Sequence, residues 1–411
     1  MKALVIGLGI SGKGAVKLLR HLGYQVTGVD RDIANKNIEG ALLFSERDFL
    51  SDFDFNLVVI SPGIGQTHPL AVRAKKKGIE IIGEVELALR SLKNPCIGIT
   101  GTNGKTTLTL LLTHIFNASG KKAQALGNIG TSLSEQIVHL GPKTIVVLEL
   151  SSFQLETIST PTFDCGVITS ITPDHLDRYP SFESYARVKG YLSYLIKPNG
   201  FLCIGFGVNQ FKHFFSPLIL KKIIDLESYL QVTPKERYLE MSETLQMAYA
   251  VCERFGVKQN TFYEAQKGFT PPPHRLELLG EIESVWYYND SKATNVEAVG
   301  YALKKISSQV LLIAGGEAKG ASFEIWKELF KGKVKKIFAI GKTAPLIEKT
   351  LKTDYKVEML PDLERAFRQA KRQAQPGEVV LLSPGCASFD QFKNFEERGN
   401  HFKELFQKFR S

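Results

Sequence analysis

Short apolar runs alternate with amphipathic stretches along the whole chain, and this pattern predicts α/β domains built on mainly parallel sheets. The apolar runs are rich in β-branched residues and end at glycines or polar residues, which is typical of buried strands entering loops. Strands are predicted at 3–6, 26–29, 57–60, 97–100, 144–148, 166–169 and 310–313. Helices are predicted at 84–90, 108–116 and 245–255, and a further helix begins near residue 181.

Glycine-rich turns follow three of these strands, at 7–12, 101–107 and 314–316. Each turn opens a domain of the nucleotide-binding type. A short polar linker at 91–95 and a triple proline at 271–273, which cannot continue a helix, separate the three units. The predicted domains are therefore 1–92, 93–272 and 273–411.

Composition places the chain among ordinary globular proteins. It has 411 residues, of which 43% are apolar and 23% charged, so disorder is excluded as the main state. No apolar run approaches the ~20 residues that cross a bilayer. Glycines interrupt the apolar start of the chain, so no export signal is expected. The five cysteines lack metal or redox spacing, which favours buried thiols in a reducing cytoplasm.

Basic residues exceed acidic ones by 52 to 42, which gives a formal net charge of +10. This balance permits an anionic partner, either a nucleic acid or a small polyanion. The lysines occur in short clusters without interleaved aromatic residues. We therefore interpret the basic surface as solvated and expect neither a nucleic acid nor a membrane as partner.

The first glycine turn, Gly-Leu-Gly-Ile-Ser-Gly at 7–12, fits G-x-G-x-x-G, and the next strand ends at Asp30. This arrangement holds a phosphate at a helix N-terminus and an acid beside a sugar hydroxyl. Ser61 to Gly63 follow another strand and would close the cleft. A nicotinamide dehydrogenase needs a second mononucleotide half, and this domain is too short for one. A turn that serves only packing is the other alternative.

The second glycine turn, Gly-Thr-Asn-Gly-Lys-Thr-Thr at 101–107, lies between a strand and an apolar helix. This is a P-loop arrangement, in which backbone N–H groups hold phosphates, Lys105 reaches the β- and γ-phosphates and Thr106 binds Mg²⁺. The strict motif would place its first glycine at Ile99, so the loop is a variant.

Two further positions point to metal or phosphate chemistry. Glu149 ends a buried strand beside the P-loop, where a carboxylate holds Mg²⁺, although a salt bridge would also explain it. His175, in Asp-His-Leu-Asp at 174–177, is a candidate metal ligand or phosphate contact. The alternative is a structural histidine.

Lys189 lies in an apolar stripe with Phe182, Tyr185, Leu192 and Ile196 on the predicted helix from 181. A lysine in such a stripe either extends its amine to solvent or is functional. Burial favours the neutral amine, which reacts with CO₂ to give a carbamate that binds Mg²⁺ like a carboxylate.

Taken together, six motifs resemble the Mur ligases of bacterial peptidoglycan synthesis, in collinear order over nearly the whole chain. Two of them, at 149–156 and 382–392, are similar to the D-glutamate-adding branch. The motifs are GTNGKTT at 101–107, ELSSFQLE at 149–156, DHLDRY at 174–179, PHR at 273–275, NDSKATN at 289–295 and LSPGCASFDQF at 382–392.

The resemblance implies an N-terminal Rossmann-like domain for the UDP moiety, a central P-loop ATPase-like domain with a mainly parallel sheet, and a C-terminal Rossmann-like domain that closes on ATP and D-glutamate. It implies the following site residues. The UDP-sugar substrate would contact Gly9, Ser11, Gly12, Asp30, Arg31, Ser61, Pro62, Gly63, Asn128, Ser151, Gln154 and His175. ATP would contact Gly101, Thr102, Asn103, Gly104, Lys105, Thr106, Thr107, Arg275 and Asp290. The D-glutamate end would contact Thr294, Lys319, Ser388 and Phe395, and Lys292 would be a further substrate contact.

The implied activity is ATP-dependent amide formation between UDP-N-acetylmuramoyl-L-alanine and D-glutamate through an acyl phosphate, without NAD, in a monomeric cytoplasmic bacterial enzyme. Lys105, Glu149, His175 and Lys189 would be catalytic. Two Mg²⁺ ions would be held by Thr106 and Glu149, and by His175 and carbamylated Lys189.

The segment at 240–244 departs from the family pattern, since relatives often carry His-Asn-x-x-Asn there as an adenine contact. Adenine recognition is therefore expected to differ, and the stretch 201–237 is hard to align. The alternatives are another ligase of the superfamily, adding L-alanine, a diamino acid, a dipeptide or folyl-linked glutamate, and a nucleotide-binding regulatory protein. The Asp-Asn-Pro-Arg motif of diamino-acid addition is absent from the sequence.

Overall fold

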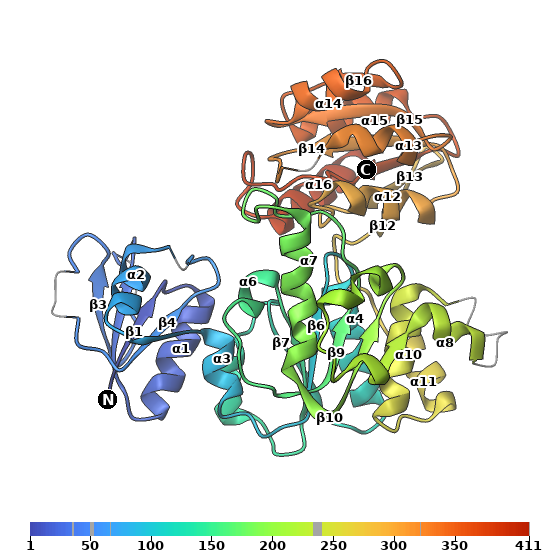
Figure 1. Cartoon of the computed structure of the whole chain (residues 1–411). Coiled ribbons are helices and arrows are strands. Elements are labelled where there is room, and N and C mark those ends of the chain that lie inside the picture. The colour runs from blue at the N-terminus through green and yellow to red at the C-terminus, as the bar shows by residue number, and fades with distance from the viewer. Residues whose placement is uncertain (35–36, 50–52, 66, 233–240, 321, 411) are drawn as a thin grey trace. The chain divides into compact units, whose positions relative to one another are not determined.

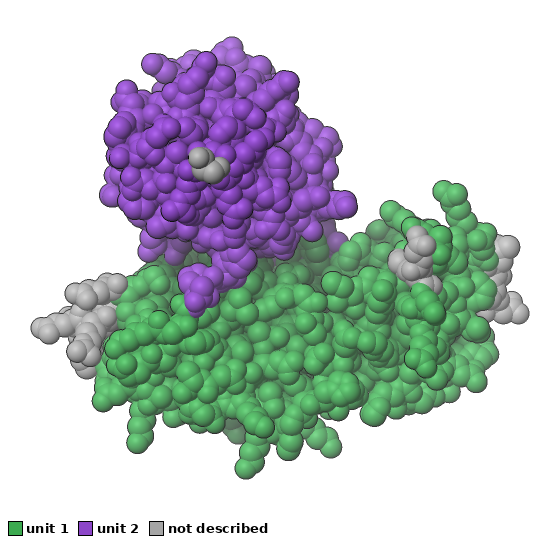
Figure 2. All heavy atoms as spheres, turned by 180° about the vertical axis from the view of Figure 1, so that it is seen from behind, with its two compact units in different colours: residues 1–171, 186–269 green, residues 172–185, 270–411 purple. Residues whose placement is uncertain are grey.

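The computed structural model describes residues 1–34, 37–49, 53–65, 67–232, 241–320 and 322–410, and three α/β sheets follow one another along the chain (Figure 1). Contacts divide the chain into two compact units, coloured in Figure 2. Unit 1 comprises residues 1–171 and 186–269, and unit 2 comprises residues 172–185 and 270–411. The three predicted domains each contain one sheet; their boundaries at 92/93 and 272/273 remain predictions.

The N-terminal sheet is entirely parallel, in the order β3-β2-β1-β4-β5. The strand order reverses beside β1, so the loops after β1 and β4 form the crevice in which such sheets bind ligands. Its strands are β1 (Lys2–Ile6), β2 (Gln25–Asp30), β3 (Ala41–Ser45), β4 (Leu57–Ile60) and β5 (Glu80–Gly83), and its helices are α1 (Ile10–His21), α2 (Pro69–Lys76) and α3 (Glu84–Leu89).

The central sheet is also parallel, in the order β11-β10-β9-β6-β8-β7. Its strands are β6 (Cys96–Thr100), β7 (Ala123–Gly127), β8 (Ile145–Glu149), β9 (Phe163–Ile168), β10 (Ile196–Ile204) and β11 (Ile223–Asp225). Its α-helices are α4 (Lys105–Ala118), α5 (Leu133–Gln136), α6 (Ser152–Leu155), α7 (Phe182–Gly190), α8 (Leu226–Val232), α10 (Glu243–Arg254) and α11 (Gln259–Lys267). Its 3-10 helices are η1 (Ile137–His139), η2 (Tyr191–Leu195), η3 (Val208–Phe214) and η4 (Leu220–Lys222).

The C-terminal sheet, in the order β12-β13-β17-β14-β15-β16, is parallel except for β12, which pairs antiparallel with β13. Its strands are β12 (Glu277–Ile282), β13 (Val285–Asn289), β14 (Val310–Gly315), β15 (Val334–Ile340), β16 (Lys356–Met359) and β17 (Val379–Leu382). Its helices are α12 (Val296–Lys305), η5 (Phe323–Ile325), α13 (Trp326–Leu329), α14 (Ala344–Leu351), α15 (Leu363–Gln373) and α16 (Phe395–Arg410).

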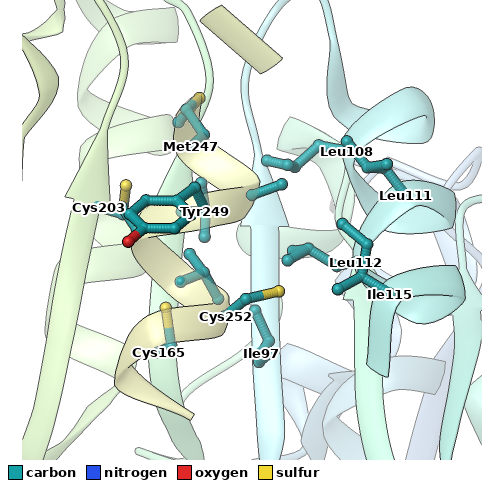
Figure 3. Packing of buried hydrophobic residues seen from close by; sticks show 14 of the residues in the cluster. Ile97, Leu108, Leu111, Leu112, Ile115, Cys165, Cys203, Met247, Tyr249 and Cys252 are labelled. Atoms are coloured by element: carbon teal, nitrogen blue, oxygen red, sulfur yellow. The ribbon is translucent and has the colours of Figure 1, made fainter. Parts of the chain in front are cut away.

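The core of the central domain lies where α4 and α10 pack over the sheet, and three cysteines belong to it (Figure 3). Cys165, Cys203 and Cys252 are fully buried free thiols. Burial raises the pKa of Cys203 to about 12 and raises that of Cys252 further. The prediction that the cysteines are buried small hydrophobes is confirmed, because Cys96 and Cys386 are buried and free as well.

The six-residue helix α3 ties the N-terminal domain to the central domain within unit 1. It contacts both α1 and α5. The Glu84 carboxylate accepts a hydrogen bond from the Ser134 backbone N–H at 2.7 Å. Glu86, with no exposed surface, accepts the backbone N–H groups and hydroxyls of Ser159 and Thr160. Burial raises the pKa of Glu86, but these hydrogen bonds outweigh it and hold the pKa below its usual value.

One predicted helix is shorter than expected. The helix starting near residue 181 is α7, which ends at Gly190; the next five residues form η2, and Ile196 begins β10. The stripe that contains Lys189 is therefore not one helical face, although Lys189, Leu192 and Ile196 are all buried. An apolar stripe marks burial, and burial alone does not distinguish an α-helix from a 3-10 turn that enters a strand.

Of the segment expected to alter adenine recognition, Glu240 lies outside the described residues, as do residues 233–237 of the stretch that is hard to align. The helix predicted after it is α10, which begins two residues earlier than expected, at Glu243. Among the described helices, none combines the length and the apolar character needed to cross a membrane.

Candidate functional site

The glycine turn of the N-terminal domain is built around the carbonyl oxygen of Gly7. The Ser61 hydroxyl donates to this oxygen at 2.8 Å, and this bond joins the loops after β1 and β4. A Cβ at Gly12 would lie 1.9 Å from the same oxygen, so only glycine fits there. Asp30 accepts the Leu8 backbone N–H at 2.5 Å. Asp30 therefore holds the turn in place, a role that the sequence did not indicate.

The remaining residues predicted for the UDP moiety surround this turn. Gly9 is the N-cap of α1 and Ser11 lies in its first turn. An added Cβ at Gly9 or Gly63 would meet no atom within 4 Å, so both glycines face open space. Pro62 lies beside Gly63 in the turn after β4. The Arg31 side chain is 85% exposed and lies 3.6 Å from the Glu46 carboxylate.

The second glycine turn is a P-loop whose backbone is fixed by the end of β9. Gly101 has φ +144°, and a Cβ there would lie 1.9 Å from the Thr169 hydroxyl. The Thr102 N–H donates to the Ser170 carbonyl at 2.8 Å, and the Asn103 N–H donates to the Ser170 hydroxyl at 3.0 Å. Gly104, with φ +86°, is the N-cap of α4, and no side chain caps this helix. The N-terminal N–H groups and dipole of α4 thus favour an anion.

Two lysine ammonium groups converge on one carbonyl oxygen of this loop. Lys105 Nζ donates to Gly101 O at 2.8 Å and to Thr102 O at 3.0 Å. Lys189 Nζ donates to the same Gly101 oxygen at 2.9 Å, although its side chain comes from α7, and Lys189 is 1% exposed. Thr106 and Thr107 follow Lys105 in the first turn of α4. Lys105 and the N-terminus of α4 therefore bring positive charge to the place where P-loops hold phosphates.

Glu149, the last residue of β8, lies one strand away from the P-loop strand β6 and is 2% exposed. The Asn128 side-chain amide donates to Glu149 Oε1 at 3.0 Å, whereas the buried Oε2 has no hydrogen-bond partner among the described residues. A buried carboxylate oxygen without a partner is costly unless a cation binds it. These residues fit Mg²⁺, which needs one or two carboxylates when phosphate oxygens and water complete its coordination.

Ser151 and Gln154, predicted to contact the muramoyl substrate, form the capping box of α6. The Gln154 side-chain carbonyl accepts the Ser151 N–H at 2.9 Å and its hydroxyl at 3.1 Å. Gln154 is 4% exposed. Both side chains therefore stabilise the turn after Glu149, next to Asn128.

Unit 2 gathers the residues predicted for the amino-acid substrate on the loops after β13, β14 and β17. Lys319 Nζ lies 3.5 Å from the Thr294 hydroxyl and 3.5 Å from the Asp174 carboxylate. Asn295 also donates to Asp174, at 3.3 Å. Asp174 therefore ties the segment that carries His175 to two of these loops. His175 has φ +55°, and its side chain is 30% exposed.

Asp174 was missed as a site residue, although it stands in the Asp-His-Leu-Asp motif next to His175. The missing signal was spatial: its partners Asn295 and Lys319 are more than a hundred positions away in the sequence. His175 Nε2 lies 3.7 Å from the Asp174 carboxylate, which also accepts the His175 backbone N–H at 2.9 Å.

Arg275 is held on a strained turn between His274 (φ +63°) and Leu276 (φ +47°). Non-glycine residues with positive φ cost free energy and concentrate at functional sites. The Asp290 carboxylate holds this turn, because it accepts the Leu276 N–H at 3.0 Å and the Ser383 hydroxyl at 2.8 Å. Burial raises the pKa of Asp290 to about 7.

The ammonium group of Lys292 lies 3.8 Å from the centre of the Phe395 ring, a close cation–π contact. Phe395 begins α16, and its carbonyl oxygen accepts the Ser291 hydroxyl at 2.8 Å. Ser388, which is 2% exposed, lies in the loop after β17. The structure thus places Lys292, Phe395 and Ser388 at the same edge of the sheet as Thr294 and Lys319.

Replacing Glu297 with glutamine should stabilise unit 2 at alkaline pH. Burial raises the pKa of Glu297 to about 7, and the nearby Asp174 charge adds to the shift. Its buried Oε2 has no partner among the described residues. Because the pKa of Glu297 is higher in the folded than in the unfolded state, the folded state binds the proton more tightly. The free energy of unfolding therefore falls as pH rises from the unfolded-state pKa to about 7.

Glutamine cannot ionise, so the Tm of Glu297→Gln should exceed that of the unaltered protein at pH 8 and match it near pH 5. Thermal unfolding at both pH values measures the difference. The control is Glu404→Gln, because the Glu404 side chain is 73% exposed. A Tm difference of the same size at both pH values would contradict the interpretation.

Three family profiles match the chain in sequence order: "Mur ligase MurD-like, N-terminal domain" at residues 1–83, "Mur ligase middle domain" at 99–223 and "Mur ligase, glutamate ligase domain" at 274–386. A UDP-N-acetylmuramoylalanine–D-glutamate ligase from Protochlamydia amoebophila is 42% identical over 98% of this chain and 97% of the relative. This chain belongs to the Mur ligase family. A ligase of the same name from Aquifex aeolicus is 38% identical to this Mur ligase, over 98% of each chain.

Solved structures of other Mur ligases share the fold. MurC from Thermotoga maritima superimposes with a TM-score of 0.59 at 15% identity and covers 99% of both chains. MurF from the same organism, solved with ADP, gives 0.61 at 14% identity over 99% of this chain and 94% of its own. The predicted α/β fold with three domains is thereby confirmed for this Mur ligase.

Proposed function

We propose that this Mur ligase joins D-glutamate to UDP-N-acetylmuramoyl-L-alanine at the expense of ATP, in the synthesis of peptidoglycan precursors. The observation that carries the proposal is that relatives named for this reaction are 34–42% identical over 98% of the chain. The motifs at 149–156 and 382–392, which resemble the D-glutamate-adding branch, also support it.

The reaction proceeds in two steps. A carboxylate oxygen of the L-alanyl group forms a bond to the γ-phosphorus of ATP while the bond between this phosphorus and ADP breaks, which gives an acyl phosphate. The amine of D-glutamate then attacks the acyl carbon, loses a proton, and inorganic phosphate leaves. Both steps bring anions together, so the site must supply positive charge.

In unit 1, Lys105 and the first turn of α4 hold the β- and γ-phosphates. Lys105 and Lys189 converge on Gly101 O, so both side chains lie at the loop that would hold the phosphates. Glu149 and Thr106 would hold a Mg²⁺ ion, with Asn128 orienting the carboxylate through Oε1. When bound, Mg²⁺ neutralises the phosphate oxygens and polarises the γ-phosphoryl group.

We further propose that Lys189 carries a carbamate and, with His175, holds a second Mg²⁺ ion. The burial of Lys189 at 1% exposure supports this assignment, because burial favours the neutral amine that reacts with CO₂. His175 is also a candidate for the group that takes the proton from the incoming ammonium.

In unit 2, Lys319, Thr294 and Ser388 would bind the carboxylates of D-glutamate, with Lys292 and Phe395 beside them. Arg275 and Asp290 would contact ATP; the strained turn around Arg275 supports a role in ligand binding. We also propose that the enzyme acts as a cytoplasmic monomer on small molecules, with neither nucleic acid nor membrane as partner.

The test is the release of inorganic phosphate by the purified protein with ATP, Mg²⁺, UDP-N-acetylmuramoyl-L-alanine and either D- or L-glutamate. The proposal expects release that requires both the D isomer and the UDP-linked substrate. Omission of each component in turn provides the controls, and chelation of Mg²⁺ should abolish release.

Release with another amino acid or another UDP-linked precursor, but none with D-glutamate, would contradict the proposed specificity. It would move this protein to another reaction of the Mur ligase family and leave the ATP site as described. No phosphate release with any precursor and amino acid of the family would favour a nucleotide-binding regulatory protein.

A further inference from the structure

A buried arginine, Arg398, lies on α16 in the C-terminal domain. It is 1% exposed and is among the largest fully buried side chains of the described residues. Arginine is almost never fully buried unless its charge is paired. Among the described residues, none of the hydrogen-bond acceptors of Arg398 is a carboxylate, so an ion pair does not account for its position.

All of its donor nitrogens are engaged, and their acceptors belong to two loops. Nε donates to the Ser291 hydroxyl at 3.0 Å, and Nη2 donates to the Ser291 carbonyl at 2.8 Å. Nη1 donates to the carbonyls of Cys386 at 3.2 Å and Ala387 at 3.4 Å, while Nη2 also reaches Cys386 at 3.2 Å. A planar guanidinium with five N–H groups is suited to hold several carbonyls in one fixed arrangement.

A third loop packs on the same group. Ala387 and Glu317 exchange backbone hydrogen bonds at 2.9 and 3.0 Å. A Cβ at Gly316 would lie 2.2 Å from Ala387 O and 3.3 Å from Arg398 Nη1, so the loop after β14 approaches the guanidinium as closely as a backbone can. Arg398 therefore lies where the loops after β13, β14 and β17 contact one another.

These three loops carry Thr294, Lys319 and Ser388. Ser388 directly follows Ala387, and Thr294 lies three residues after Ser291. Lys319 reaches Thr294 at 3.5 Å. Arg398 thus donates hydrogen bonds into the two loops that carry Thr294 and Ser388, and a change in these bonds would shift Ser388 relative to Thr294. The loop of Lys319 is joined to them through the backbone hydrogen bonds between Glu317 and Ala387.

We propose that Arg398 is a positioning residue for the incoming amino acid, since its guanidinium fixes the loop after β17 against the loop after β13 and so sets the spacing of Ser388, Thr294 and Lys319. This inference rests on the proposed function, in which these three side chains bind D-glutamate. Arg398 itself is buried and does not touch the substrate.

The test compares Arg398→Lys and Arg398→Met with the unaltered enzyme. Lysine keeps the charge but donates from one atom, so it cannot span Ser291 and Cys386 together; methionine removes both charge and donors. Both variants should raise the KM for D-glutamate by about 10- to 100-fold, the usual effect of losing a supporting contact. The KM for the UDP-linked substrate should stay within about twofold, because its predicted contacts in the N-terminal domain do not involve the loops that Arg398 holds. The KM for ATP should rise less than that for D-glutamate, since Ser291 is next to Asp290.

The matched control is Arg410→Met, because Arg410 is exposed on the same helix. It should leave all three KM values unchanged. Circular dichroism and thermal unfolding establish that each variant is folded. If Arg398→Met does not fold, Arg398→Lys and a titration of D-glutamate against the enzyme with bound ATP analogue carry the test.

An unchanged KM for D-glutamate in folded Arg398→Lys would overturn the proposal, as would an equal rise in all three KM values, which is the mark of a general structural role. Failure of the proposed function is distinguishable, because it appears in the unaltered enzyme as no use of D-glutamate. The same comparison is then made with the amino acid that the unaltered enzyme accepts, and a selective rise in its KM still supports the positioning role.

Discussion

Replacing Lys189 with alanine should lower the turnover number by about 10³-fold, the scale on which enzymes lose activity when a stabiliser of transition-state charge is removed. Lys189 is 1% exposed, and its Nζ shares the Gly101 carbonyl oxygen with Lys105. Alanine removes the side chain from this buried position and leaves the backbone of the P-loop intact, because Thr169 and Ser170 hold the loop from the other side.

Short carboxylic acids such as formate or acetate should restore part of the lost activity. The alanine variant leaves a space of the size of the lysine side chain, and a small carboxylate in it replaces the proposed carbamate as a Mg²⁺ ligand. Phosphate release in the presence of each acid measures the recovery. Carbon NMR after incubation of the unaltered protein with isotopically labelled bicarbonate tests the carbamate directly.

The matched control is Lys197→Ala, since Lys197 lies nearby in the sequence on β10 and pairs with Asp164 at 3.0 Å at a half-exposed position. Its activity should equal that of the unaltered protein, with or without added acid. If Lys189→Ala turns over at the unaltered rate, Lys189 has no role in the reaction. If amines restore activity and carboxylic acids do not, the group needed is an ammonium, and the carbamate is wrong.

Replacing Glu149 with glutamine should lower the turnover number by about 10²- to 10³-fold and raise the Mg²⁺ concentration needed for half-maximal activity. The amide carbonyl of glutamine still accepts the hydrogen bond that Asn128 now donates to Oε1. The substitution therefore preserves the shape of the site and removes the negative charge, including that of the buried Oε2. A Mg²⁺ titration at saturating ATP measures both effects.

For this variant the control is Glu264→Gln, because Glu264 is an exposed residue of the same domain that pairs with Lys267. It should reproduce the Mg²⁺ titration of the unaltered protein. A Glu149→Gln enzyme with an unaltered rate and an unaltered Mg²⁺ requirement would show that Glu149 is not a metal ligand. In that case its role is limited to holding Asn128.

The strands of the fold were predictable because each is an apolar run bounded by glycine or polar residues. Residues 57–60 form β4 as expected, and β6, β8 and β14 differ from their predicted ranges by one or two residues. The predicted helix after residue 181 was too long, because Leu192 and Ile196 continue the apolar spacing of α7 while the backbone has already left the helix. The tertiary packing of β10 determines where α7 ends, and a local sequence pattern carries no information about that packing.

The site was predictable where one short motif carries the whole geometry, as in the P-loop at 101–107. It was not predictable where the partner is distant in the sequence. Asp30, expected at a sugar hydroxyl, accepts the Leu8 N–H in this structure, and the five donor contacts of Arg398 reach residues up to 107 positions away. In the sequence alone, Asp30 cannot be distinguished from other aspartates, and Arg398 cannot be distinguished from an exposed arginine.

The contacts of helix α3 also affect where recombination can separate the N-terminal domain from the central domain. The profile of the N-terminal domain ends at residue 83, whereas Oε1 of Glu84 and the Glu86 carboxylate accept hydrogen bonds from Ser134, Ser159 and Thr160 of the central domain. A crossover placed after α3 would set α3 of one enzyme against the central domain of another. Buried carboxylates of α3 would then lack the serine and threonine that donate hydrogen bonds to them. Recombination between two Mur ligases is therefore tolerated best just ahead of Glu84, and a chimeric enzyme should inherit α3 together with its central domain.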